Sequence, residues 1–196
     1  MYQHLNEVVS ILSNIGCWVH AYFFFGRSLR RSALFMGGAM VLGTISELAA
    51  IATTGGYNYD GFWWYIGTVP LFIAIGWGAA FYFPFVFTSM IARHLPRKKL
   101  LLLWFGLIAG SIGVSIDLWY DPVAVALGWW SWKNPGPYYA VPTSNFVGWF
   151  CFTALFCTLF LFIDTRTWTF RRKTLVFIAL LPVVLLITAA VSFPFF

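Results

Sequence analysis

Residues 111–149 read SIGVSIDLWYDPVAVALGWWSWKNPGPYYAVPTSNFVGW, and this stretch decides how the chain is organised. It joins two apolar runs of membrane-spanning length, Leu100–Tyr120 and Phe146–Ile163. Two carboxylates, Asp117 and Asp121, lie four residues apart near the end of the first run. Because four residues make slightly more than one helical turn, both acids are expected to project from one face of a helix.

A dense aromatic and amide segment follows the two acids. Pro122 disfavours helical geometry at the preceding residue, so the helix is expected to end at Asp121. The polar and aromatic side chains beyond it are Trp129, Trp130, Trp132, Tyr138, Tyr139, Asn145 and Trp149. Tyrosines and tryptophans between two apolar runs are typical of the aromatic belt at a membrane interface.

Composition places the chain among integral membrane proteins. Of its 196 residues, 61% are hydrophobic and 9% charged, whereas ordinary globular domains carry about 25% charged residues. The length predicts an all-α, polytopic transmembrane bundle of about six helices, forming a single membrane domain over residues 1–196. The expected apolar runs are Val8–Phe25, Ala33–Thr53, Phe62–Ile91, Leu100–Tyr120, Phe146–Ile163 and Thr174–Val191.

The third apolar run is long for one crossing and contains Pro70 and Pro84. It predicts either one kinked, tilted helix or an interfacial segment followed by a helix. A polar turn, Thr53–Gly61, precedes it. The sequence leaves the two alternatives open.

Basic residues predict the orientation. Eleven of the twelve lie in the connections after the first, third and fifth runs: Arg27, Arg30, Arg31, Arg93, Arg97, Lys98, Lys99, Arg166, Arg171, Arg172 and Lys173. Only Lys133 lies in a connection of the opposite parity. The positive-inside rule therefore places these three loops in the cytoplasm and both termini outside it. Short juxtamembrane groups of this kind argue against nucleic-acid binding.

Four carboxylates then lie toward the outer face: Glu47, Asp60, Asp117 and Asp121. Glu47 is expected roughly 10 Å deep and Asp117 roughly 6 Å deep, at about 1.5 Å per residue, so the two are predicted to face one another. Carboxylates in membrane helices usually face the bundle interior or a wet cavity. A protonated carboxylic acid against apolar walls is a candidate general acid, and aromatic faces stabilise cations. The pattern favours acid-catalysed chemistry on an electron-rich, membrane-dissolved substrate such as a polyene or prenyl chain.

Each of these polar residues also has a structural interpretation. Asp117 could join its helix to a neighbour, Asp121 could anchor the following loop, and a buried amide or tyrosine hydroxyl could hold Glu47. Asp60 follows a glycine-rich turn, where aspartate commonly bonds its own backbone. Asn145 is suited to cap the start of the fifth helix. The aromatic residues could be interfacial anchors rather than substrate contacts.

Other catalytic classes lack their signatures. His4, His20 and His94 show no metal-ligand spacing, which excludes a di-iron desaturase or hydroxylase with a histidine cluster. Cys17, Cys151 and Cys157 lie in apolar runs and form no CxxC pair. The sequence has no phosphate-binding or dinucleotide motif and no nucleophile elbow. These absences agree with a chemistry that needs neither a metal nor another cofactor, such as the addition of water.

Several motifs, in the same order, resemble the signature of the CruF-like carotenoid biosynthesis membrane proteins. The resemblance covers Ser46–Trp149. It is carried by IDLWYDP at 116–122, GWWSW at 128–132, YYAVP at 138–142 and NFVGW at 145–149, after Glu47, GYNY at 56–59, GTVPL at 67–71 and Trp77. Ala140 departs from the pattern, which usually has glycine there.

The resemblance implies a cofactor-independent hydratase that adds water across a terminal double bond of an acyclic carotenoid such as lycopene. It implies a lipid-soluble polyene or isoprenoid substrate, membrane lipid and other carotenoid biosynthesis enzymes as partners, and a prokaryotic cytoplasmic membrane. By this analogy the acid and water-positioning groups are Asp117, Asp121 and Glu47. The residues expected to contact or orient substrate or water are Tyr57, Asn145, Trp129, Trp132, Tyr138, Tyr139 and Asp60.

Two other function classes remain. Intramembrane carboxylates and proline-broken helices also suit a small proton-coupled transporter. Against transport, the chain shows no inverted repeat and its acids gather toward one face. A non-catalytic carotenoid- or lipid-binding subunit is the second alternative. Such a binder should tolerate Asp117→Asn, whereas a general acid should not.

Overall fold

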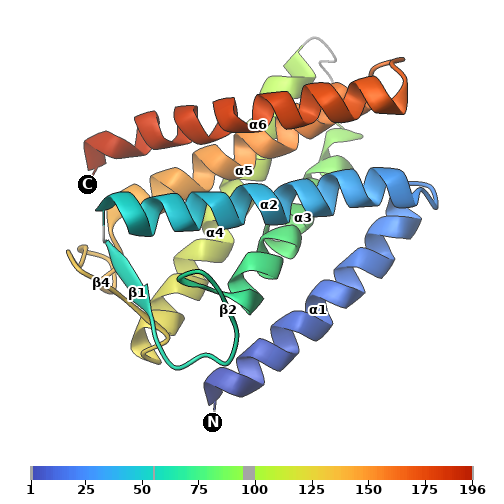
Figure 1. Cartoon of the computed structure of the whole chain (residues 1–196). Coiled ribbons are helices and arrows are strands. Elements are labelled where there is room, and N and C mark those ends of the chain that lie inside the picture. Colours follow the sequence, from blue (N-terminus) through green and yellow to red (C-terminus); the bar gives the residue numbers. More distant parts are fainter. Residues whose placement is uncertain (1, 55, 95–99, 196) are drawn as a thin grey trace. The chain divides into compact units, whose positions relative to one another are not determined.

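The computed structural model describes residues 2–54, 56–94 and 100–195, and six long helices dominate them (Figure 1). This confirms the predicted all-α fold. Arg97, Lys98 and Lys99 of the second basic group lie outside the described residues. The helices are α1 (Tyr2–Phe24), α2 (Leu29–Thr54), α3 (Leu71–Ala92), α4 (Leu101–Ala126), α5 (Thr143–Asp164) and α6 (Phe170–Ser192), with a 3-10 turn, η2 (Phe193–Phe195), after α6.

Within the described residues, five helical segments are long and apolar enough to cross a membrane: Leu29–Thr53, Leu71–Ala92, Leu101–Ala126, Thr143–Asp164 and Phe170–Phe195. Helix α1 is not among them, and its buried side mixes apolar residues, Cys17 and Ala21, with polar ones. Glu7 and Asn14 are buried, while Leu12 and Val19 on the other side are exposed. The first predicted span, Val8–Phe25, thus lies within a helix that begins earlier, at Tyr2, and its crossing of the membrane stays a prediction.

The chain divides into two compact units, residues 1–82 with 119–142 and residues 83–118 with 143–196. Helices α3 and α4 each contribute a segment to both units. We call them unit 1 and unit 2 and describe each by itself. The single membrane domain expected from the sequence stays a prediction.

Two short β-ribbons belong to unit 1. Strands β1 (Tyr57–Tyr59) and β4 (Trp130–Trp132) pair antiparallel, and they join the α2–α3 connection to the α4–α5 connection (Figure 1). These two connections therefore lie on one side of a membrane, as the alternation of basic residues predicts. Which side faces the cytoplasm stays a prediction.

The second ribbon resolves the two alternatives for the third apolar run. Strands β2 (Tyr65–Ile66) and β3 (Val69–Pro70) form a hairpin, and α3 begins at Leu71. Gly67 has φ +61° in the turn, a conformation that glycine adopts without strain. The run is therefore a separate segment followed by a helix, with Pro84 inside that helix.

The predicted end of α4 at Asp121 is wrong, because the helix continues through Pro122 to Ala126. A proline only removes one helical hydrogen bond and disfavours helical geometry before it, and packing overrides such local preferences. Helix α4 is terminated instead by Gly128, which lies two residues beyond Ala126 and has φ +66°. The Gly128 and Trp129 amides donate to the carbonyls of Val125 (3.0 Å) and Ala124 (2.9 Å), the pattern of a glycine-terminated helix.

In unit 2, glycines let α4 approach α5 closely. Gly106, Gly110 and Gly113 all face α5. A Cβ atom added at Gly110 would lie 2.7 Å from the Phe150 carbonyl oxygen, which is backbone and has no rotamer to change. Small residues at such positions bring membrane helices together by van der Waals packing.

Replacing Gly110 with alanine is expected to destabilise unit 2 by about 1–3 kcal/mol, because the two helix backbones must separate. Thermal unfolding of the detergent-solubilised protein measures this. Gly16→Ala in α1 is the matched control, since an added Cβ there meets nothing within 4 Å. Equal melting temperatures for the two variants would contradict the close packing of α4 and α5.

Candidate acid site under an aromatic ribbon

Glu47 is the centre of the polar site in unit 1. It is half-buried near the end of α2, and its Oε2 accepts hydrogen bonds from the hydroxyls of Tyr57 and Tyr59, the latter at 3.1 Å. Alternate residues of a strand point to one face, so β1 directs both tyrosines inward and leaves Asn58 exposed. The sequence offered a tyrosine hydroxyl as one structural partner for Glu47, and the observed contacts match that alternative.

Trp77 from α3 packs beside the same carboxylate. Its indole interacts with Glu47, and its ring covers Gly43, one helical turn earlier on α2. A Cβ atom at Gly43 would overlap the Trp77 ring. Because Gly43 has no side chain, the Trp77 indole has the space to pack there and to contact Glu47.

Strand β4 adds tryptophans to the inner face of the ribbon. The Trp132 ring lies 4.7 Å from the Tyr57 ring, and the Trp130 ring lies 5.6 Å from the Tyr59 ring. Ser131 between them is exposed. The pairing of β1 with β4 therefore places four aromatic rings over the end of α2 that carries Glu47.

Asp121 is the second carboxylate of this site. It is buried on α4, and it acts electrostatically on both Tyr57 and Tyr59. Burial raises the pKa of each of these tyrosines well above its usual value, and the negative charge of Glu47 acts in the same direction. Both hydroxyls therefore remain protonated donors well above neutral pH.

The free energy of unfolding is expected to fall as pH rises above about 10. Tyrosines of an unfolded chain ionise near that pH, whereas Tyr57 and Tyr59 keep their protons, so the unfolded state releases protons first. The free energy of unfolding falls by at most about 1.4 kcal/mol per pH unit for each of the two tyrosines. Melting temperatures between about pH 9 and 11 measure it, since that range brackets the ordinary tyrosine pKa. A Tyr57→Phe/Tyr59→Phe variant with the same slope as the wild type would contradict this origin.

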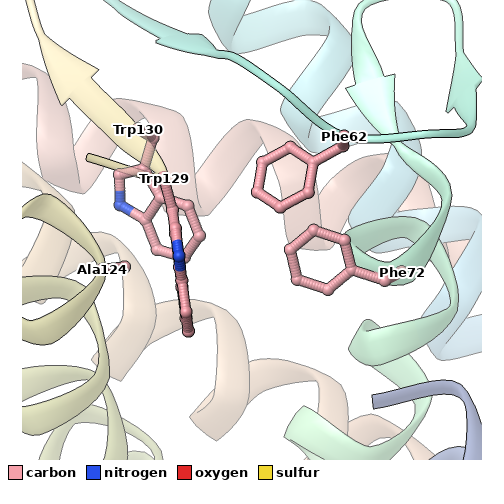
Figure 2. Close-up of a cluster of buried hydrophobic side chains, with 5 residues drawn as sticks. All are labelled: Phe62, Phe72, Ala124, Trp129 and Trp130. Carbon is pink, nitrogen blue, oxygen red and sulfur yellow. The ribbon is translucent and has the colours of Figure 1, made fainter. Parts of the chain in front are cut away.

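An aromatic cluster extends the site away from Glu47. Figure 2 shows Trp129 between Trp130 and Ala124 on one side and the Phe62 and Phe72 rings on the other. All five side chains are buried. Because Trp130 also contacts Tyr59, the cluster is continuous with the aromatic face over Glu47.

Asp117 lies in unit 2, where Asn145 donates a hydrogen bond of 2.8 Å from Nδ2 to its Oδ2. Asp117 is fully buried and follows the glycines that bring α4 against α5. Asn145 lies within the first turn of α5, which begins at Thr143, so its amide contacts Asp117 rather than capping the helix. The contact fits the alternative in which Asp117 joins two helices. The predicted facing of Asp117 and Glu47 stays a prediction.

The remaining predicted contact residues are exposed. Asp60 follows β1, and Tyr138 and Tyr139 are 42% and 70% exposed, which suits interfacial anchors better than the walls of a site. Ala140 has φ +64°, a conformation that favours glycine. This conformation explains why the resembling motif usually has glycine at that position. In this chain Ala140 adopts it with backbone strain.

Sequence reasoning gave no site role to three polar or aromatic residues of unit 1: Tyr59, Trp77 and Glu7. Tyr59 repeats Tyr57 at strand spacing, a signal present in the sequence. Trp77 belongs to the resembling motifs, but its contact with Glu47 and Gly43 of α2 is visible only in the structure. Glu7 is fully buried, and its carboxylate accepts a hydrogen bond from the Trp63 amide (3.0 Å) and contacts His4 Nδ1 (3.2 Å).

A groove of about 550 Å³ lies along α4 in unit 2. Ser115 is among its lining residues, and at about 100° per residue Asp117 is on the opposite side of the helix. The groove therefore does not lead to that carboxylate. No group of three or more histidine, cysteine or acidic side chains suited to a metal ion occurs among the described residues.

Fold and site together define a multi-pass integral membrane protein in which a half-buried carboxylate, Glu47, and a buried one, Asp121, lie beside an aromatic ribbon. The sequence profile of the carotenoid biosynthesis protein family matches residues 5–195, so the chain belongs to that family and has a role in carotenoid biosynthesis. No curated protein and no solved structure matches the chain.

Proposed function

We propose that this protein is a hydratase that adds water to a terminal double bond of an acyclic carotenoid or related isoprenoid. The observation that carries the proposal is the Glu47 carboxyl group, which two tyrosine hydroxyls hold under an aromatic ribbon. Family membership supplies the substrate class, and the site supplies an acid beside faces that stabilise positive charge.

Glu47 is the proton donor in this proposal. Both tyrosine hydroxyls donate to Oε2, so Oε1 is the oxygen that carries the proton. The alkene π electrons take this proton at the less substituted carbon, and a tertiary carbocation forms at the other. As Glu47 becomes a carboxylate, the hydrogen bonds from Tyr57 and Tyr59 become charge-assisted and strengthen. The site thus stabilises the charge that develops during proton transfer.

The aromatic rings and Asp121 act on the cation in the next step. Rings of Tyr57, Tyr59, Trp130 and Trp132 present negative faces that attract a cation within about 6 Å. A water oxygen forms the new C–O bond with a lone pair, and its surplus proton passes to the Asp121 carboxylate. The sum is one alkene and one water converted to one tertiary alcohol, with the proton returned to Glu47 through solvent.

Asp117 has a supporting role in the same proposal. One helical turn before Asp121 on α4, and bonded to Asn145 on α5, it fixes the helix segment that precedes the second carboxylate. Asp117→Asn keeps a side chain of the same shape, so it tests whether the negative charge at this position is needed.

Expression in a lycopene-accumulating bacterium, with pigment analysis by chromatography and mass spectrometry, tests the function. We expect a product heavier than lycopene by one water. Purified protein that binds lycopene, and leaves it and other acyclic polyenes unchanged, would favour the non-catalytic subunit and overturn the hydratase. A product that forms in both Asp117→Asn and Glu47→Gln variants would keep the reaction and overturn the site.

A further inference from the structure

Trp129 carries a hydrogen-bond donor that the described part of the chain does not satisfy. Its side chain is 7% exposed, and its Nε1 has no acceptor among the described residues. A buried indole N–H normally has a partner, because leaving it unpaired is costly. The donor therefore points to a ligand with an acceptor atom.

A second donor lies close to the same place. The Asn6 amide on α1 donates one hydrogen to the Tyr120 hydroxyl. An amide nitrogen carries two hydrogens, and the buried Nδ2 has no further acceptor among the described residues. The Tyr120 ring is 6.4 Å from the Trp129 ring. Donors from α1 and from the turn after α4 thus gather around one tyrosine of α4.

Charge and shape limit what these donors bind. Asp121 follows Tyr120 in the chain and acts on it electrostatically, which disfavours an anion. The cluster around Trp129 is otherwise apolar, with Phe62, Phe72 and Ala124 as walls (Figure 2). A small neutral oxygen fits both conditions, since water accepts from two donors and still donates to a carboxylate.

We propose that Trp129 and Asn6 bind the water molecule that captures the carbocation. The inference rests on the proposed hydratase function and assigns its nucleophile a position. Trp129 is held in place before substrate arrives, because its amide donates to the Ala124 carbonyl at the end of α4 (2.9 Å). The water is bound between the two donors and Asp121, the carboxylate that takes its proton.

Deuterium labelling separates water capture from proton donation. In D2O, Glu47 carries a deuteron, so every carbocation that reverts to alkene can leave deuterium at the vinylic carbon of recovered lycopene. Trp129→Phe keeps an aromatic ring and removes the N–H donor. We expect about a tenfold loss of hydrated product, with deuterium still entering the recovered substrate. Asn6→Leu keeps a side chain of similar size. It should likewise lose hydrated product while deuterium still enters the recovered lycopene.

Trp119→Phe is the matched control, because Trp119 precedes Tyr120 on α4 and is 68% exposed. It should change neither readout. Loss of hydration and deuteration in equal proportion in Trp129→Phe and Asn6→Leu, or no loss of either, would overturn the water site. Wild-type protein that neither hydrates nor deuterates lycopene would instead refute the hydratase itself, and the water site with it.

Discussion

Replacing Glu47 with glutamine is expected to lower the rate of hydration by about 10²- to 10⁴-fold, the usual contribution of general acid catalysis. Glutamine keeps the shape of the side chain and its carbonyl oxygen still accepts from Tyr57 and Tyr59. It has no carboxyl proton to give, so protonation of the alkene fails while the fold persists. Initial rates with lycopene in detergent or membranes, normalised to protein amount, measure the effect.

Asp164→Asn is the control for Glu47→Gln. Asp164 ends α5 in the other unit, where its backbone carbonyl accepts from Lys173 Nζ (2.6 Å), so removal of its charge should leave hydration unchanged. Deuterium exchange into lycopene should disappear in Glu47→Gln together with hydration, because both need the carbocation. Exchange that continued at the wild-type rate would place the proton donor elsewhere.

Variants of Tyr57 and Tyr59 test whether the two hydroxyls assist Glu47 as an acid. Because Tyr57 and Tyr59 both donate to Oε2, their separate removal by Tyr57→Phe and Tyr59→Phe should weaken the acid by smaller steps than Glu47→Gln. Effects of residues that act through one carboxyl group are not additive. A double variant no slower than the slower single one, with the other single variant at the wild-type rate, would show that only one hydroxyl stabilises the carboxylate.

The helices could be predicted from the sequence because their signal is local. Apolar runs of membrane length and the basic groups between them predicted six helices in the observed order, with some ends displaced by six to nine residues. The end of α4 could not be predicted in this way. Pro122 is a local stop signal, whereas the helix end depends on Gly128 and on the burial of Ala124 against rings from distant segments.

Strands β1 and β4 were missed for a different reason. Tyr57–Tyr59 and Trp130–Trp132 each alternate aromatic and polar residues, but three residues are too short a pattern to distinguish from a turn. Each strand forms only because the other is there. Charge and motif were therefore enough to choose Glu47 and Tyr57 as candidates. Their contacts, of Glu47 with Tyr59 and of Tyr57 with Trp132, could not be predicted without the strand pairing.

Gly43 shows how a residue without a side chain contributes to the site. Nothing in the sequence marks it, because its role is the space it leaves for Trp77 on another helix. Gly37 on the same helix leaves open space instead, since an added Cβ there meets nothing within 4 Å. The two glycines therefore form a matched pair, in which only one supports the position of an indole against Glu47.

Replacing Gly43 with alanine is expected to lower hydration by about 100-fold, the effect of displacing catalytic groups by about 1 Å. The added methyl group must push the Trp77 ring away, and the contact between Trp77 and Glu47 is lost. Gly37→Ala should keep the wild-type rate. In a Trp77→Leu background Gly43→Ala should add little, because the ring that it displaces is already gone. Losses that multiply in the double variant would mean that Gly43 acts on α2 itself, and a Gly43→Ala protein with full activity would show that Trp77 does not position the acid.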